Sequence, residues 1–191
     1  MKRIILITGG QRSGKSEEAE RMALSLSPHP VYMATAHVWD EEFRQRVKKH
    51  QQRRGPEWTN IEEEHRLSQH DVTGRVVLID CVTLWLTNLF FEENRPENPE
   101  NPETPETPDN PGKPAIPAIP AILAQAQADF DRFTSQDATF IFVTNEIGWG
   151  GVSENRLQRQ FTDLQGSMNQ YIAQKADEVF MMVSGIAVKV K

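Results

Sequence analysis

The sequence has few of the features that would place it outside ordinary globular proteins. Its single cysteine, Cys81, excludes an internal disulfide and fits a reducing cytoplasm. No apolar run approaches the length of a membrane span, and the basic, apolar start at residues 2–7 is too short for a signal peptide. We therefore expect a cytoplasmic chain without a membrane span, folded as one domain over residues 1–191.

The sequence also lacks an excess of positive charge. Its net charge is −6, but residues 92–113 hold seven acids and two bases, a local charge of −5, so the rest of the chain sums to −1. A nucleic-acid-binding face across the whole domain would need a strong basic excess. We expect no nucleic-acid partner.

The most informative segment that is present is Gly9–Ser16, which reads GGQRSGKS and directly follows the apolar run 4–8. This is the G-x-x-x-x-G-K-S phosphate loop between a strand and a helix. Its glycines let backbone N–H groups curl around a phosphate chain, to which the helix N-terminus adds its dipole. Lys15 can reach the outer phosphates, and the Ser16 hydroxyl can hold Mg²⁺. The loop predicts a nucleoside triphosphate site rather than a plain glycine-rich turn.

Strands and helices alternate along the rest of the chain. Predicted strands are Arg3–Thr8, Val31–Ala34, Val76–Asp80, Thr139–Thr144, Val179–Val183 and Ile186–Val190, the last two joined by a two-residue turn at Ser184-Gly185. Predicted helices are Ser16–Leu26, Asp40–Arg54, part of Val82–Phe91, Ala121–Phe133 and about Ser153–Lys175. Predicted core stripes on the first and last helices are Ala19, Met22, Ala23 and Leu26, and Leu157, Phe161, Leu164 and Met168. This order predicts an α/β fold: a mainly parallel sheet with helices on both faces and an antiparallel edge hairpin.

A proline-rich insertion at about 94–120 interrupts this alternation. Nine prolines occupy every third position: Pro96, Pro99, Pro102, Pro105, Pro108, Pro111, Pro114, Pro117 and Pro120. A polyproline II helix has three residues per turn, so this spacing would place all nine along one edge. The insertion could dock in an aromatic-lined groove of a partner, but we favour a passive, semi-rigid surface segment because long loop insertions cost little stability.

Asp80 ends the apolar strand 76–80, which comes after the phosphate loop in the sequence. A carboxylate at the end of such a strand approaches the metal ion beside the serine of the loop. A strand-end aspartate can also cap the next helix. Together with the loop, Asp80 favours the metal site, so we predict that Ser16 and Asp80 hold Mg²⁺.

The predicted helix 40–54 carries a histidine among bases. Asp40 suits the helix N-cap, and Phe43, Val47 and His50 fall on one face. Six bases surround this face: Arg44, Arg46, Lys48, Lys49, Arg53 and Arg54. On spacing alone, a core histidine on a solvated basic helix would explain the pattern. Such a concentration of bases is also a polyanion site, however, and an imidazole held there can attack phosphorus to form a covalent intermediate.

Short motifs along almost the whole chain carry a resemblance. They are Gly9–Ser16, Tyr32–Ala36, Arg46–His50 with Trp58, Asp80–Thr83 with Thr87–Leu89, Val143–Gly148, Glu154–Arg156 and Val183–Ile186. Together they resemble the bifunctional adenosylcobinamide kinase/adenosylcobinamide-phosphate guanylyltransferase family of cobalamin synthesis. The resemblance implies a RecA-like P-loop fold, a homotrimer, and Mg²⁺ bound with ATP or GTP.

It also implies two reactions and a set of site residues. A γ-phosphoryl group passes from ATP or GTP to adenosylcobinamide, and GMP then passes from GTP to adenosylcobinamide-phosphate through a guanylylated histidine. His50 matches that histidine, and Lys15 acts with it in catalysis. The implied nucleotide contacts are Gly9, Gly10, Gln11, Arg12, Ser13, Gly14, Lys15, Ser16, Ala34, Thr35, Ala36, Gln51, Gln52, Arg53, Arg54, Glu62 and Asp80.

Two other functions are compatible with parts of the sequence. Another small-molecule P-loop kinase would use the loop and Asp80 but would leave the basic helix around His50 without a purpose. A non-catalytic nucleotide-dependent binding module would use the proline-rich insertion as its partner-binding arm. Covalent labelling by GTP distinguishes the first alternative, and deletion of residues 96–120 distinguishes the second.

Overall fold

The computed structural model describes residues 2–38, 41–52, 54–92 and 119–191 of the chain. Seven further side chains lie outside this description: Glu42, Phe43, Arg46, Lys49, His50, Gln51 and Glu92. The predicted cap at Asp40, the predicted contact at Arg53 and the proline-rich insertion up to residue 118 therefore lie outside the described residues. For His50 and Gln51 the helical backbone alone is described.

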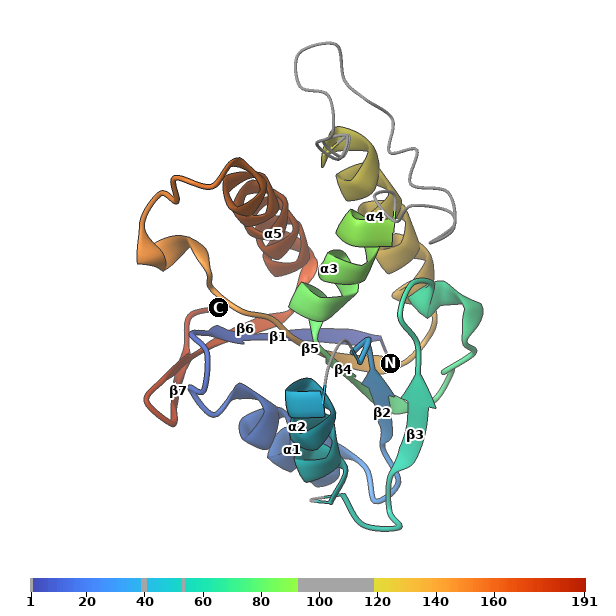
Figure 1. The fold of residues 1–191 in the computed structure, drawn as a ribbon. Helices are drawn as coiled ribbons and strands as arrows, with labels where there is room; N and C mark the ends of the chain where they lie inside the picture. Colours follow the sequence, from blue (N-terminus) through green and yellow to red (C-terminus); the bar gives the residue numbers. More distant parts are fainter. Residues whose placement is uncertain (1, 39–40, 53, 93–118) are drawn as a thin grey trace, which may run out of the picture.

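Seven strands form one sheet in the order β3-β2-β4-β5-β1-β6-β7 (Figure 1). Their bounds are β1 Arg3–Gly9, β2 Val31–Ala34, β3 Thr59–Glu62, β4 Val76–Asp80, β5 Thr139–Val143, β6 Glu178–Val183 and β7 Ile186–Lys189. Every neighbouring pair is parallel except β6 and β7, which are antiparallel. The predicted mainly parallel sheet with an antiparallel edge hairpin is confirmed.

The central strands are apolar on both faces, as strands of a parallel sheet covered on both sides must be. In β1, Ile4 and Leu6 join one buried cluster, and Ile5 and Ile7 join another on the opposite face. The strands β4 and β5 alternate between the same two clusters. Continuous apolar runs at the first and fourth strands therefore fix the middle of the sheet.

Helices cover both faces (Figure 1). Their bounds are α1 Lys15–Leu26, α2 Glu41–Gln52, α3 Val82–Glu92, α4 Ile119–Phe133 and α5 Arg156–Lys175, with short 3₁₀ turns at Leu67–Gln69 and Gly148–Gly150. The helices α1 and α2 lie on one face, and α3, α4 and α5 lie on the other. Among the described residues, no helix is both long enough and apolar enough to cross a membrane.

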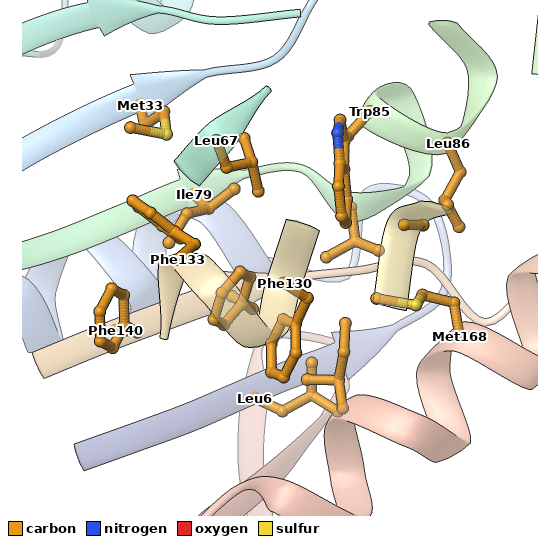
Figure 2. Packing of buried hydrophobic residues seen from close by; sticks show 14 of the residues in the cluster. Leu6, Met33, Leu67, Ile79, Trp85, Leu86, Phe130, Phe133, Phe140 and Met168 are labelled. Atoms are coloured by element: carbon orange, nitrogen blue, oxygen red, sulfur yellow. The ribbon is translucent and has the colours of Figure 1, made fainter. Parts of the chain in front are cut away.

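The face under α3, α4 and α5 holds the larger core, which is rich in aromatic residues (Figure 2). Phe130 packs on Phe142 with ring centroids 5.1 Å apart, and Phe133 packs on Phe140 at the same distance. From α5, Leu164 and Met168 are fully buried, and Leu157 and Phe161 pack against the cluster from its edge. The predicted stripe on the last helix is confirmed.

Several predicted boundaries shift for local reasons. The helix α5 begins at Arg156 rather than near Ser153, because the Asn155 side chain accepts a hydrogen bond from the Gln158 N–H and caps the helix. The helix α4 begins at Ile119, so Pro120 belongs to its first turn, where a proline costs no hydrogen bond. The predicted insertion therefore ends before residue 119.

Two further expectations are corrected. The edge strand β3 is absent from the predicted strands, since its sequence TNIE has one apolar residue, Ile61. The predicted stripe on α1 holds for Ala19 and Ala23, which are buried, and for Met22, which packs at the edge of the core. Leu26 is 41 % exposed because it ends the helix beyond the sheet-facing turn.

Candidate nucleotide-binding site

The phosphate loop joins β1 to α1 in a conformation that requires glycine. Gly9 has a φ of 151°, and a Cβ there would lie 2.7 Å from the carbonyl oxygen of Met182 in β6. Gly14 has a φ of 93° in the left-handed region and forms the N-cap of α1. The backbone conformation and the close packing thus explain why the motif has glycine at positions 9 and 14.

Neighbouring segments hold the loop in place. The N–H of Gly185, in the β6–β7 turn, donates to the carbonyl of Ser13 at 3.0 Å, and the N–H of Glu146 donates to the carbonyl of Gly9 at 3.1 Å. Within the loop, the Ser13 N–H donates to the Gly10 carbonyl at 3.3 Å. The loop is therefore held by the C-terminal hairpin and by the segment that follows β5.

Lys15 lies inside the loop that it serves. Its Nζ donates to the Gly10 carbonyl at 2.6 Å, and the residue is 7 % exposed. Burial lowers the pKa of Lys15, whereas the neighbouring Cys81 and Asp80 oppose that shift. A phosphate group in the loop would add negative charge beside this ammonium. Nearby, Ser13 Oγ is buried and has no hydrogen-bond partner in the described part of the chain.

Asp80 is held by Tyr32 from the neighbouring strand. The Tyr32 hydroxyl donates to Asp80 Oδ2 at 2.7 Å, and burial followed by the charge of Asp80 raises the pKa of Tyr32 well above its usual range. The guanidinium carbon of Arg54 stands 3.4 Å from the centre of the Tyr32 ring. Trp58 packs edge-on against that ring, with centroids 5.8 Å apart. The side chain that follows α2 is thus connected through Tyr32 to the predicted metal ligand.

Arg54 presents unused donors. Its Nε and Nη1 atoms are buried and have no hydrogen-bond partner among the described residues. Buried donors are satisfied in nearly all folded proteins, so an unsatisfied guanidinium points to a missing acceptor. A phosphate or carbonyl oxygen of a nucleotide is such an acceptor.

Thr35 is fully buried and has a different role from its neighbours Ala34 and Ala36. Its hydroxyl donates to the Cys81 carbonyl at 2.7 Å and accepts from the Cys81 N–H at 2.8 Å. Its own carbonyl accepts from the side-chain amide of Asn88 at 2.8 Å. Thr35 therefore ties the end of β2 to the end of β4 and does not line the cleft.

A cleft of about 1400 Å³ opens at the C-terminal ends of the parallel strands, where open α/β sheets bind ligands. It brings together twelve of the predicted contacts: Gln11, Arg12, Ser13, Gly14, Lys15, Ser16, Ala34, Ala36, Gln52, Arg54, Glu62 and Asp80. Gly9, Gly10 and Thr35 support this cleft without lining it. Val47, in the middle of α2, lines it as well. The loop and the end of the basic helix therefore face one space.

Several cleft residues were not predicted from the sequence. Tyr32, His37, Glu64, Leu84, Asn145 and Glu146 all line it. His37 Nδ1 and Glu64 Oε2 lie 2.8 Å apart. The signal available for Asn145 and Glu146 is their position directly after an apolar strand of a parallel sheet.

Magnesium fits the donors that the cleft offers. The Ser16 hydroxyl and the Asp80 carboxylate are the hard oxygen ligands that Mg²⁺ takes alongside substrate phosphates. The hydrogen bond from Tyr32 goes to Asp80 Oδ2, which leaves Oδ1 for a ligand. No group of three or more His, Cys, Asp or Glu residues suited to a metal occurs among the described residues. The cleft therefore suits a nucleotide-borne Mg²⁺.

The fold and the cleft define an α/β P-loop nucleotide-binding protein. Among solved structures, an ATPase from the type III secretion system of pathogenic bacteria aligns with a TM-score of 0.50 and 8% identity, over 98% of this chain and 56% of that one. At this identity the likeness concerns the fold alone.

The chain belongs to the cobinamide kinase/cobinamide phosphate guanyltransferase family, whose model matches residues 5–190. It is 36% identical over 192 residues to the bifunctional adenosylcobalamin biosynthesis protein CobU of Escherichia coli K12, covering 98% of this chain and 99% of the relative. The protein of the same name from Salmonella typhimurium is 35% identical over 195 residues, again covering 98% and 99%. The resemblance inferred from the motifs is confirmed.

Proposed function

We propose that this chain phosphorylates adenosylcobinamide with ATP or GTP and transfers GMP from GTP to adenosylcobinamide-phosphate, with His50 as the guanylylated residue. Family membership supports the two activities. The observation that carries the proposal is the shared cleft. The phosphate loop lines it from one side, and Val47 and Gln52 of α2, with Arg54, line it from the other.

In the kinase reaction the loop holds the triphosphate so that its γ-phosphorus faces the substrate alcohol. Lys15 and the loop N–H groups neutralise charge on the β- and γ-phosphates. Ser13 Oγ, which has no partner among the described residues, supplies a further donor. These groups position the phosphates and stabilise charge without forming a covalent bond to them.

In the guanylyltransferase reaction the α-phosphorus faces α2 instead. Residue 50 follows Val47 by three positions, so helical periodicity assigns it to the same face of α2. The imidazole of His50 attacks the α-phosphorus, and pyrophosphate leaves toward Lys15. The phosphate of adenosylcobinamide-phosphate then attacks the same phosphorus and releases His50.

Ser16 and Asp80 would hold Mg²⁺ in both reactions. The ion, when bound, supplies positive charge to the phosphate oxygens. Tyr32 fixes the rotamer of Asp80 through its hydrogen bond, and Arg54, stacked on Tyr32, offers its free donors to the nucleotide. This chain of contacts links the metal ligand to the residue that follows the His50 helix.

The assembly and location that we propose follow the family resemblance alone. The protein would act as a homotrimer in the cytoplasm, and a neighbouring subunit would complete the corrinoid site.

Covalent labelling tests the proposal. Wild-type protein incubated with [α-³²P]GTP should retain an acid-labile, base-stable label that maps to His50 after proteolysis. His50→Ala should lose this label and keep much of its kinase activity, while His29→Ala, which changes an exposed histidine, should label like the wild type. Label retained on denatured His50→Ala protein would refute the assignment. A kinase-active wild type without label would indicate a plain small-molecule kinase.

A further inference from the structure

The motif Val143–Gly148 carries a carboxylate that the two reactions described above do not use. Glu146 follows β5, the strand that lies between β1, which leads into the phosphate loop, and β4, which ends in Asp80. Its side chain is half-buried and lines the cleft. A carboxylate therefore stands between the loop and the predicted metal ligand.

Side chains of the scaffold hold one oxygen of the Glu146 carboxylate in place. The Thr8 hydroxyl donates to Glu146 Oε1 at 2.8 Å, and Asn169 Nδ2 approaches the same oxygen at 3.4 Å. No side chain among the described residues bonds Glu146 Oε2. One oxygen is thus held by the scaffold, and the other remains for a ligand.

A buried network in turn holds Asn169. The Thr144 hydroxyl donates to Asn169 Oδ1 at 2.7 Å, and Gln165 Nε2 donates to the same oxygen at 2.9 Å. Asn169 Nδ2 also donates to the Asn145 carbonyl at 3.1 Å. All three side chains of this network are at least nine-tenths buried. Supporting hydrogen bonds of this kind fix the orientation that a functional group needs.

We propose that Glu146 is the general base of the kinase reaction, taking the proton of the adenosylcobinamide hydroxyl. This role rests on the function proposed above. The alcohol oxygen forms a bond to the γ-phosphorus, and the bond from that phosphorus to the β,γ-bridging oxygen breaks. The nucleoside diphosphate leaves with the electron pair. The proton passes to Glu146 Oε2 and later to water.

The two reactions differ in their need for this base. An alcohol must lose a proton as it attacks phosphorus. A neutral imidazole attacks through a lone pair, and the phosphate of the second substrate is already anionic. Glu146 should therefore serve phosphoryl transfer and leave guanylylation of the protein unaffected.

Other carboxylates line the cleft, namely Glu17, Glu62, Glu64 and Asp80. Glu62 ends β3 and Glu64 follows it, at the far edge of the sheet, three strands away from β5. Asp80 is engaged by Tyr32 and is the expected metal ligand. Of the carboxylates that line the described cleft, Glu146 alone follows a strand adjacent to β1 and also bonds the loop through its own N–H.

The test compares both activities in one preparation of the full chain. Glu146→Gln keeps the size and the Thr8 acceptor but cannot take a proton. Its kinase kcat should fall by about 10²–10⁴-fold, while the stoichiometry of label from [α-³²P]GTP stays at the wild-type level. Asp163→Asn, which makes the same carboxylate-to-amide change at an exposed position of α5 outside the cleft, should leave the kinase rate nearly unchanged. Formate should restore part of the kinase rate of Glu146→Ala.

Two results would overturn this role while leaving the proposed function intact. One is a kinase rate in Glu146→Gln close to that of the wild type. The other is an equal loss of kinase and labelling, which would mean that the Glu146 side chain only supports the structure beside the loop through its hydrogen bond with Thr8. A wild-type protein without either activity would instead refute the proposed function, and this role with it.

Discussion

The two faces of the sheet differ in what their side chains do. The face under α3, α4 and α5 carries 25 of the buried core residues, including five phenylalanines and Trp85. Among the described residues, the opposite face carries twelve, and the two aromatic residues among these twelve, Tyr32 and Trp58, stand beside the cleft. The larger core therefore supplies most of the hydrophobic free energy of folding, and the smaller one leaves room for a ligand.

This division has a physical basis in the strands themselves. Each central strand turns alternate residues to the two faces, so β5 presents Phe140 and Phe142 to one and Ile141 and Val143 to the other. The segment that follows this strand then places Asn145 and Glu146 at the cleft. A well-packed face can hold a strand rigidly while its end carries polar chemistry. Substitutions on the two faces should consequently separate stability from activity.

The largest expected effect on stability is on the aromatic face. Phe130→Ala removes a ring that packs on Phe142 and Tyr171, and should lower the free energy of unfolding by about 3–5 kcal/mol. Urea denaturation followed by circular dichroism measures it. Activity per folded molecule should persist, because no atom of Phe130 lines the cleft. Phe91→Ala, which truncates a phenylalanine that is 42 % exposed, is the matched control and should have a small effect. Equal losses in both variants would contradict the division.

On the cleft face, Lys15→Ala should reduce both activities by about 10²–10³-fold, the loss seen when one preorganised donor to developing charge is removed. Its free energy of unfolding should change little, because burial already disfavours the charged ammonium. Steady-state kinetics and thermal melts measure the two quantities. Lys189→Ala, in the edge strand β7, should retain full activity. A large loss of stability in Lys15→Ala would contradict the separation of stability and activity between the two faces of the sheet.

A smaller effect concerns Cys81, which belongs to the smaller core and also lines the cleft. Burial, followed by the charge of Asp80, raises the pKa of its thiol to about 12. The folded state keeps this proton as pH rises above the unfolded pKa near 9, whereas the unfolded chain loses it. Stability from this group is therefore present below pH 9 and falls by up to about 1.4 kcal/mol per pH unit above it.

Unfolding free energies at pH 8, 9 and 10 would show this dependence. The wild type should lose more stability over this range than Cys81→Ala, since the other titrating groups are common to both proteins. Parallel pH profiles would show that the thiol titrates normally in the folded state.

Much of the fold follows from local patterns in the sequence. The runs at 4–7 and 76–79 are apolar on both faces, so they identify central parallel strands without any long-range information. The turn was predicted from Ser184-Gly185 between two apolar runs. In the structure both residues adopt positive φ, 49° and 85°, as a two-residue hairpin requires. In contrast, β3 has a single apolar residue and, among the described strands, pairs with β2 alone, so its strand conformation depends on its neighbour.

The site residues likewise fall into those that a local motif predicts and those that depend on strand pairing. The phosphate loop and Asp80 were identified because their chemistry lies in contiguous motifs. Tyr32 and Glu146 escaped prediction because their roles arise from strands that pair across the sheet. Thr35 illustrates the opposite case. Its position in a motif predicted a ligand contact. In the structure its hydroxyl makes two hydrogen bonds, both with the backbone of Cys81.

The hydrogen bond from Gly185 to the Ser13 carbonyl bears on when the site can form during synthesis. The first strand to leave the ribosome, β1, finds both of its partners, β5 and β6, more than 130 residues later in translation. Until residues 178–185 have emerged, the nascent chain has a phosphate-binding sequence but no phosphate-binding site. Tight nucleotide binding by a ribosome-bound chain would therefore report that β6 and the hairpin turn have already docked.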